Sequence, residues 1–551
     1  MKLFRKRKSV LTHEEKKQRK KKILLGLFSG MFLGLSFPPF PFPYLSFIAF
    51  IPFLFVLDKK ETLSSINRFS YFTFFIFNLI TLYWVGSWTK GADKFLMLSG
   101  TTLLFINPLL YLIVTTLYYF SRKSFNKKIA LYLFPLYWVS FEYLYSLTDL
   151  RFPWLTLGNA LPYFNKFIQI ADVIGVYGLS LIIIYINIFI YLAVKDFRER
   201  RKVRYTFAAA AFVIFIAVIV YGIIRINSFK LDDKKIKVGL IQPNINPWDK
   251  WQVGNLNVQL DLYLDLSKKA AQSGAKLIIW PESALPVYLL SGNNDVQVAK
   301  IQNLVSAYNI FLMTGMPDIN LFFDKNDVPA DAKPTRFGTF YTSYNSILLF
   351  SPYSPVVQKY KKIKLVPFGE HVPFVENLPF LGDFIKWEVG ISSWNVGNDQ
   401  TLFEFNNDSG SIIKAAGVVC IESIYPDFVA GFIQQGADLI IVVTNDSWYG
   451  YSSGPFQHKE ISILRAVENR KTVVRAANGG ISCIIDPLGN TISETKLFTR
   501  DVLIGEAGIQ SGLTFYSQYP LIIPLFVSLI SILTIIIFVY KKILTKMKKK
   551  S

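Results

Sequence analysis

The chain contains repeated apolar stretches, each close to the length that a helix needs to cross a lipid bilayer. A spanning helix requires about 20 mostly apolar residues. Eight stretches of this kind occur, at residues 23–38, 43–57, 69–88, 95–120, 129–147, 174–194, 206–226 and 519–540. Hydrophobic residues make up 52% of the sequence, a high share for a soluble globular protein. We therefore predict a multi-span α-helical membrane bundle.

Basic residues are concentrated in alternate connections between these stretches. The formal net charge is +22, and Lys and Arg cluster at 59–68, 122–128 and 195–204 and near both termini. Positive residues next to membrane spans are retained in the cytoplasm, so we expect basic cytoplasmic tails at 1–22 and 541–551. The long segment before the last span is then extracytoplasmic. Charge clustered in this way is typical of membrane topology rather than of a nucleic-acid-binding face, so no nucleic-acid partner is expected.

These limits divide the chain into a membrane domain over 23–230, an extracytoplasmic domain over 235–508 and a final transmembrane helix over 519–540. In the middle segment, apolar runs alternate with helical patterns, which favours a layered α/β domain. The predicted strands cover 237–244, 276–280, 310–316, 343–350, 412–420, 439–444, 472–475 and 480–485. The predicted helices cover 261–271, 296–308, 424–435 and 457–469.

Three side chains near the ends of apolar runs can together perform acyl transfer. Glu282 follows Ile-Ile-Trp-Pro, Lys362 follows Tyr-Lys, and Cys420 follows Val-Val. The thiolate is the nucleophilic form of cysteine, so a carboxylate is needed to accept the thiol proton. An ammonium lowers the thiol pKa and stabilises the developing oxyanion. Backbone N–H groups after Cys420 add to that stabilisation if a helix starts there.

Taken singly, each of these residues also has an ordinary structural interpretation. A cysteine after an apolar run is usually a packed core residue, and an acid at a strand end is usually a surface group. Lys362 lies among Lys359, Lys361 and Lys364, and side-chain chemistry alone does not select it. The combination of the three groups favours a catalytic role over a structural one.

The remaining cysteine and the histidines give no support to metal or disulfide chemistry. The chain has two Cys and three His, too few for a zinc site or a disulfide framework. Cys483 is expected to be a buried strand residue, and both thiols are expected to be free. His458 is expected to cap a helix or accept a hydrogen bond rather than act as a base. Phosphate-loop, Rossmann and serine-elbow motifs do not occur, so we predict no cofactor and no metal.

Several linked motifs give the chain a resemblance to a known family. They are Trp-Pro-Glu-Ser-Ala at 280–284, Leu-Val-Pro-Phe-Gly-Glu-His-Val-Pro at 365–373, Val-Cys-Ile-Glu at 419–422, Asn-Asp-Ser-Trp-Tyr-Gly at 445–450 and Arg-Ala-Ala-Asn-Gly-Gly at 475–480. On these motifs the segment 235–508 resembles the nitrilase superfamily. With its spans, the whole chain resembles the membrane-bound apolipoprotein N-acyltransferase family. The resemblance implies an α/β/β/α sandwich with a Glu–Lys–Cys triad.

The same resemblance implies roles for individual residues. Glu282 is the implied general base, Lys362 the oxyanion stabiliser and Cys420 the acylated nucleophile, with Glu370 and Glu422 as supporting acids. The family commonly has Tyr directly after the nucleophile, and this chain has Ile421. Any polar contribution at that position must therefore come from the backbone.

Aromatic segments are expected to contact lipid. Trp251 matches an aromatic position near the family's substrate entrance, and Trp448 lies in a short aromatic segment. Phe374 and Trp387 belong to the segment 373–394, which we expect to form either a mobile lipid-facing lid or a small core under a loop.

Two features of the membrane half are also candidates for function. The loop over 151–163 is expected either to line a lipid entrance or to form a plain aromatic belt. Glu142 is a functional candidate because it is ionisable within a span, or else it reaches the lipid headgroups.

We therefore expect a membrane acyltransferase that takes an acyl chain from a phospholipid donor onto Cys420. The resemblance implies that the acceptor is the amino group of a diacylglyceryl-cysteine at the N-terminus of a lipoprotein. The protein is expected to be a monomer in the bacterial cytoplasmic (inner) membrane. Two alternatives are a membrane-anchored nitrilase-type amidase that hydrolyses its acyl-enzyme, and a non-enzymatic lipid- or lipoprotein-binding protein.

Overall fold

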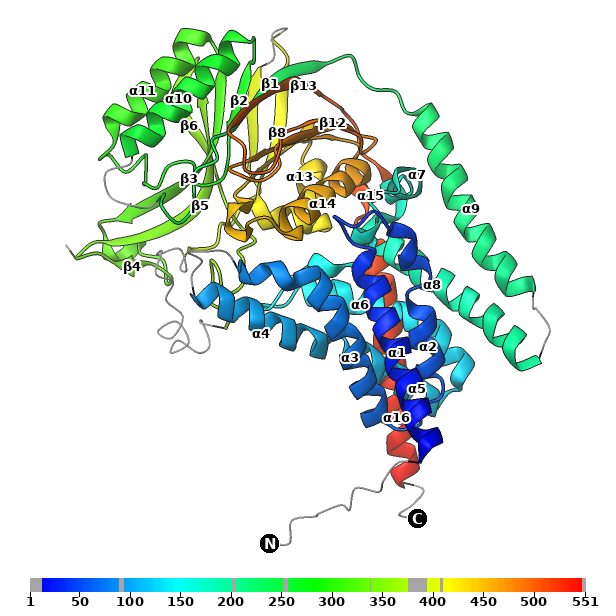
Figure 1. Cartoon of the computed structure of the whole chain (residues 1–551). Coiled ribbons are helices and arrows are strands. Elements are labelled where there is room, and N and C mark those ends of the chain that lie inside the picture. Colours follow the sequence, from blue (N-terminus) through cyan, green and yellow to red (C-terminus); the bar gives the residue numbers. More distant parts are fainter. Residues whose placement is uncertain are drawn as a thin grey trace.

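The computed structural model describes residues 12–88, 94–200, 205–250, 256–336, 338–374, 394–406 and 410–547 of the 551-residue chain. Two aromatic residues predicted to contact substrate, Trp251 and Trp387, lie outside the described residues, as does most of the predicted lid over 373–394. The described part consists of a helical bundle with an α/β sandwich stacked on one end of it (Figure 1).

The bundle contains most of the long helices of the chain. They are α1 His13–Leu35, α2 Phe50–Leu57, α3 Leu63–Leu82, α4 Lys94–Leu110, α5 Leu112–Ser124, α6 Lys127–Ser146, α8 Ala171–Arg200, α9 Tyr205–Ser228 and α16 Ile522–Met547. Within the described residues, five helical segments are long and apolar enough to cross a membrane: Leu63–Gly86, Lys94–Ser124, Ala171–Glu199, Tyr205–Ser228 and Ile522–Thr545. The predicted multi-span helical bundle is thus confirmed.

The other three predicted spans, 23–38, 43–57 and 129–147, are helical but do not meet the same criterion. Helix α1 begins inside the predicted basic tail, α2 has only 8 residues, and α6 contains Glu142, a proline and several tyrosines and serines, which lower its hydropathy. All three pack within the bundle, α1 against α3, α2 against α8 and α6 against α16. The start of α1 and the end of α16 lie at the same end of the bundle, away from the sandwich (Figure 1).

The sandwich has two sheets with helices on their outer faces (Figure 1). The first sheet has the order β13-β1-β2-β3-β5-β4, with β6 paired to β5. Its strands are β1 Lys235–Gln242, β2 Leu277–Trp280, β3 Phe311–Phe322, β4 Lys333–Pro334, β5 Phe340–Ser351, β6 Ser354–Lys361 and β13 Asp501–Gly508. Helices α10 Leu256–Gln272 and α11 Asp295–Tyr308 cover it.

The second sheet has the order β12-β11-β10-β9-β8-β7. Its strands are β7 Leu402–Asn406, β8 Ile412–Val419, β9 Leu439–Thr444, β10 Thr472–Ala477, β11 Cys483–Ile485 and β12 Thr491–Glu494. Helices α13 Pro426–Gln434 and α14 Ser453–Asn469 cover its outer face, while β3 packs on β9 and β5 on β8. The predicted α/β/β/α sandwich is therefore confirmed.

The buried parallel strands were predictable, and the antiparallel strands at the margins were not. In β2, β9 and β10 every residue is buried, as expected for strands covered on both faces. Strands β6, β7, β12 and β13 fall where no strand was predicted, and they mix polar with apolar residues. The predicted strand over 412–420 ends one residue earlier, at Val419.

The aromatic loop over 151–163 joins the bundle to the sandwich. Trp154 is buried, its Nε1 donates to Gln457 Oε1 of α14 over 2.7 Å, and its ring lies 5.3 Å from the His458 ring. The loop thus packs against the sandwich through Trp154, and its two predicted roles, a lipid entrance and an aromatic belt, stay predictions. Glu142 is buried beside it and accepts from Leu157 N over 2.8 Å, so this carboxylate holds the loop instead of reaching headgroups.

A buried charge network forms a second joint between the two parts. Asp172 of α8 accepts from Arg470 Nε and Nη2 over 3.0 and 2.9 Å and from Arg225 Nε over 2.7 Å. Arg470 also donates to Gln169 Oε1 over 2.6 Å. Because both Asp172 and Arg470 are almost fully buried, each needs the other to compensate its charge.

Asp172→Ala should therefore destabilise the protein. The substitution leaves the buried Arg470 guanidinium without its counterion, which costs about 3–5 kcal/mol. Thermal unfolding of the detergent-solubilised chain should show a clearly lower midpoint. The matched control is Glu506→Ala, because Glu506 pairs with Lys235 over 3.0 Å at an exposed site and such pairs contribute about 0–1 kcal/mol. Equal midpoints for the two variants would contradict the structural role of the network.

Candidate active site

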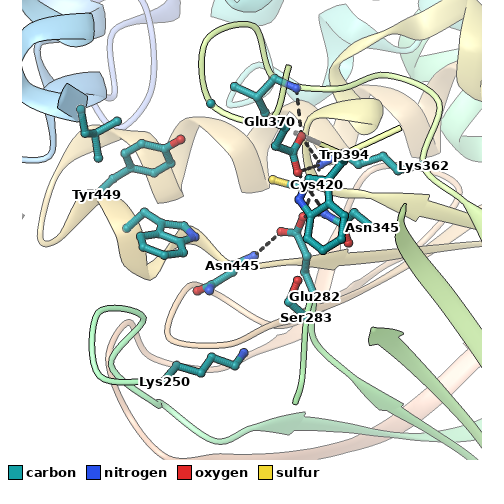
Figure 2. A pocket seen from close by; sticks show the side chains of 14 residues that line it. Lys250, Glu282, Ser283, Asn345, Lys362, Glu370, Trp394, Cys420, Asn445 and Tyr449 are labelled. Atoms are coloured by element: carbon teal, nitrogen blue, oxygen red, sulfur yellow. Dashed lines mark hydrogen bonds and ion pairs between the residues drawn. The ribbon is translucent and has the colours of Figure 1, made fainter. Parts of the chain in front are cut away.

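The structure brings Glu282, Lys362 and Cys420 together in one pocket (Figure 2). Glu282 follows β2, Lys362 follows β6, and Cys420 follows β8. Strands β2 and β8 belong to different sheets, so the pocket lies where the two sheets face each other at their carboxyl edges. Ligands commonly collect at this edge in α/β folds.

The carboxylate of Glu282 is held by three donors. Its Oε1 accepts from Asn345 Nδ2 over 2.8 Å and from Lys362 Nζ over 3.3 Å, and its Oε2 accepts from the backbone N–H of Asn445 over 3.1 Å. The backbone around Glu282 lies against Gly315 of β3, where an added Cβ would lie 2.5 Å from Glu282 Cα. This close approach fixes the height of the carboxylate above the sheet.

Lys362 lies between two carboxylates. Only 1% of the residue is exposed, and its Nζ lies 2.8 Å from the carboxylate of Glu370 and 3.3 Å from that of Glu282. Burial opposes the charge, but Glu370 and Glu282 outweigh it and raise the pKa of Lys362 well above its usual range. The side chain is therefore a permanent cation within the pocket.

The neighbouring lysines are directed elsewhere, which resolves the ambiguity of the sequence. Lys359 Nζ pairs with Asp318 over 3.0 Å, Lys361 lies over the Tyr344 ring, and Lys364 lies over the Tyr425 ring. Alternation along β6 directs Lys359 and Lys361 to the face opposite Tyr360, because successive side chains of a strand point to opposite faces. Lys362 and Lys364 follow the end of the strand. Among these four lysines, Lys362 alone lines the pocket.

Cys420 stands at a sharp change of backbone direction. Strand β8 ends at Val419, and a 3-10 helix over Cys420–Ile424 begins with Cys420 at a φ of 51°. A positive φ is uncommon for a residue other than glycine and marks a position held by its surroundings. Burial and the adjacent Glu282 carboxylate raise the pKa of the Cys420 thiol well above its usual range. The resting thiol is thus protonated, and it shares the pocket with the Glu282 carboxylate.

Glu422 links the turn at Cys420 to the loop that follows Lys362. Its Oε2 accepts from Val419 N over 2.8 Å, and its Oε1 accepts from Tyr360 Oη and Ile363 N over 2.7 Å each. The carboxylate is fully buried and does not line the pocket. Its contacts hold the segments on both sides of the pocket in register, which fits the supporting role predicted for it.

His458 supports Cys420 from behind. Its Nε2 lies 3.1 Å from the carbonyl oxygen of Cys420, and its Nδ1 lies 2.8 Å from Asp446 Oδ1. Burial and Arg475 lower the pKa of His458, while Arg475 overcomes burial to hold the pKa of Asp446 at about 2. His458 is therefore a neutral hydrogen-bonding partner of the turn. Cys483 is buried in β11, and both cysteines are free.

The predicted substrate-binding aromatics have different locations. Trp448 lines the pocket and packs edge-on against Trp248 with ring centroids 4.9 Å apart. Phe374 is exposed and is not part of the pocket wall, and its backbone N–H donates to Asp149 over 3.1 Å. Trp251 and Trp387 lie outside the described residues, so their roles stay predictions.

Sequence reasoning missed several residues of the pocket. Asn345 of β5 donates to both Glu282 and Glu370, and Asn445, Tyr449 and Lys250 also line the cavity. A polar side chain inside an apolar strand was the available signal for Asn345. Lys250 carried no signal, because one lysine in a loop is ordinary. No cluster of metal-binding side chains occurs within the residues that the structure describes, and the site's chemistry is that of a thiol, a base and an ammonium.

Two family models match the chain. The model described as the apolipoprotein N-acyltransferase N-terminal domain matches residues 29–189, and that of carbon-nitrogen hydrolase matches residues 237–511. Proteins named apolipoprotein N-acyltransferase are similar over most of the chain. The one from Chlorobaculum tepidum is 32% identical over 92% of this chain and 94% of its own length. The one from Geobacter metallireducens is 33% identical over 73% of each chain.

Solved structures are similar to about half of the chain. An amidase from Nesterenkonia sp. has a TM-score of 0.35 and 18% identity, and the match covers 53% of this chain and 95% of that one. A carbon-nitrogen hydrolase from Helicobacter pylori has a TM-score of 0.36 and 13% identity, covering 50% of this chain and 89% of that one.

Gly315→Ala should displace Glu282 without replacing any polar side chain of the pocket. The new Cβ would lie 2.5 Å from Glu282 Cα, and β3 cannot yield because it pairs with β2 and β5. A displacement of about 1 Å costs roughly 100-fold in rate. Alkylation of Cys420 by iodoacetamide, followed by peptide mass spectrometry, should slow accordingly because the Glu282 carboxylate is displaced within the pocket that it shares with the thiol. Gly508→Ala is the control, since its Cβ would meet Thr472 at an ordinary 3.5 Å. Equal alkylation rates would show that Gly315 does not position Glu282.

Proposed function

Because this chain belongs to the apolipoprotein N-acyltransferase family and acylates the N-terminus of lipoproteins, we propose that Cys420, Glu282 and Lys362 carry out the transfer. It is an acyltransferase of the bacterial inner membrane with phospholipid and lipoprotein substrates. The observation that carries the proposal is the convergence of these three side chains in one buried pocket.

In the first half-reaction, Cys420 takes the acyl chain. Glu282 accepts the thiol proton while Sγ attacks the carbonyl carbon of the phospholipid ester. Lys362 and the backbone N–H groups after Cys420 stabilise the oxyanion. The tetrahedral intermediate collapses, the glycerol oxygen leaves with the proton held by Glu282, and a lysophospholipid departs from a thioester on Cys420.

In the second half-reaction, an amine receives the chain. The neutral α-amino group of a diacylglyceryl-cysteine lipoprotein attacks the thioester carbon, and Glu282 accepts a proton from that nitrogen. Cleavage of the C–S bond releases the amide, and the sulfur regains its proton from Glu282. The two half-reactions form a ping-pong cycle through a covalent intermediate. Glu370 keeps Lys362 in place through both steps, and Glu422 keeps the two loops in register.

We further propose that both termini are cytoplasmic and that the sandwich lies on the extracytoplasmic side as part of a monomer. The basic clusters between alternate spans support this orientation. The common location of the start of α1 and the end of α16 also supports it (Figure 1). The pocket then faces the leaflet that contains lipid-anchored lipoproteins.

The alternative of an anchored amidase shares the first half-reaction but uses water in the second. Leu96 of the membrane domain's α4 forms part of the pocket wall. A hydrolase of soluble substrates has no need for a pocket wall built from a membrane domain. This contact favours a lipid substrate and acyl transfer. A passive binding protein would not need the Glu282–Lys362–Glu370 charge cluster.

Mass spectrometry of Cys420 tests the proposal. Incubation with a phospholipid should add one acyl chain to the Cys420 peptide, and the adduct should persist in water. A diacylglyceryl-cysteine peptide with a free amine should then discharge it, while the same peptide with a blocked amine should not. Glu282→Gln should slow adduct formation by about 10²- to 10⁴-fold, as expected for loss of a general base.

Cys420→Ala serves as the control and should give no adduct and no product. Rapid discharge of the wild-type adduct by water alone would favour the amidase. Wild-type protein that binds lipid but forms neither adduct nor product would favour a passive binding protein. Either result would overturn the proposed mechanism.

A further inference from the structure

Lys250 is a second lysine in the pocket, and the described residues provide no counterion that contacts its side chain. The residue is 1% exposed, and its Nζ has no hydrogen-bond acceptor among the described residues. It lines the same pocket as Glu282 and Cys420. Figure 2 shows it entering from a different side than Lys362, with its ammonium directed toward Ser283 and Glu282. Burying an unpaired ammonium is costly, which indicates that its partner arrives from outside.

The pocket's own carboxylates are already occupied. Glu282 accepts from Asn345, Lys362 and the backbone of Asn445. Glu370 accepts from Asn345, Lys362 and the backbone of Val366. Burial lowers the pKa of Lys250 to about 7, and Glu282 offsets only part of that effect. An anion that enters the pocket would restore the charge of Lys250 and be bound by it.

The backbone segment that leads to Lys250 is anchored by hydrogen bonds at its start and at Lys250 itself. Gln259 of α10 donates to the carbonyl oxygen of Lys250 over 3.0 Å. Earlier in the same segment, Asn244 N and Ile245 N donate to Asn478 over 2.9 and 3.0 Å. The side chain therefore extends from a fixed wall, as required of a group that recognises a ligand.

The two substrates of the proposed function differ in charge near the reacting atom. The phospholipid donor carries a phosphodiester a few bonds from the ester that Cys420 attacks. The lipoprotein acceptor brings an amine, which is cationic until it loses a proton. A lysine binds phosphate as a point charge and repels an ammonium. The charge of Lys250 is therefore complementary to the donor and not to the acceptor.

We propose that Lys250 binds the phosphodiester of the phospholipid donor and selects it for the first half-reaction. The inference rests on the proposed function and adds a specificity-determining residue to it. When the lysophospholipid departs, its phosphate departs with it, and Lys250 again lies near its neutral point. The pocket then presents less positive charge to the arriving amine, which assists the exchange of substrates.

The test compares two donors that differ only in the headgroup. Single-turnover acylation of Cys420 is measured on the full chain in detergent micelles, with dipalmitoylphosphatidylethanolamine or with dipalmitoylglycerol at equal mole fraction. In Lys250→Met, the preference for the phospholipid should fall by about 10- to 100-fold, the effect of losing one hydrogen bond to a charged group. Lys250→Arg should retain most of the preference. An equal loss of acylation rate with both donors, or an unchanged preference for the phospholipid, would overturn the proposal.

Two further measurements separate the possible causes. Added inorganic phosphate should compete weakly with the phospholipid and leave dipalmitoylglycerol unaffected. If phosphate instead changes the rate of Cys420 acylation equally with both donors, free phosphate is the ligand and the headgroup assignment is wrong. Thermal unfolding of Lys250→Met should give a midpoint no lower than wild type, because the substitution removes an unpaired buried charge. A lower midpoint would indicate a structural role instead.

Failure of the inference and failure of the proposed function give different results. Wild-type protein that forms no thioester with either donor would refute the proposed function. A thioester that forms normally, together with an unchanged donor preference in Lys250→Met, would refute only the role of Lys250.

Discussion

The buried ammonium of Lys362 between two carboxylates is the interaction on which the site depends. Removing one partner from such a cluster leaves an uncompensated charge and costs about 3–5 kcal/mol, so the three groups are retained as a unit. Lys362 N also donates to Asn345 O over 2.8 Å, and Asn345 Nδ2 donates to both carboxylates. The charge cluster is thereby locked to the edge of β5. Every group that must act on Cys420 takes its position from this arrangement.

The sandwich supplies the rigidity that this cluster needs. Cys420 and Glu282 stand at the ends of strands from opposite sheets, and the two sheets are packed face to face. Gly315 and Gly417 allow close approach where side chains would collide. Gly315 of β3 lies against Glu282, and Gly417 of β8 lies against Phe403 of its own sheet and Ile347 of the facing sheet. Small residues at these two places therefore matter to the chemistry although they carry none.

The sequence was sufficient for features that follow from local pattern. Fully apolar runs predicted the inner strands, and the order of Glu282, Lys362 and Cys420 along linked motifs predicted the residues that meet in the pocket. Features that depend on long-range packing could not be predicted. The loop around Trp154 has the composition of a membrane belt, yet its partner is Gln457, some 300 residues later. The importance of Lys250 follows only from the lack of a hydrogen-bond acceptor among the described residues around it, and the identity of β13 follows only from its pairing with β1.

Helix α14 links the two halves of the molecule at neighbouring residues. Gln457 accepts from Trp84 and Trp154 of the bundle, over 3.1 and 2.7 Å, and the next residue, His458, contacts the carbonyl of Cys420. The position of the thiol is therefore fixed relative to the helices of the bundle. In the proposed mechanism, each lipid substrate must move toward the thiol until its reacting bond reaches Cys420. The ester bond lies at the same distance from the headgroup whatever the length of the acyl chain. Acyl chains of different length therefore bring the same ester atoms to Cys420.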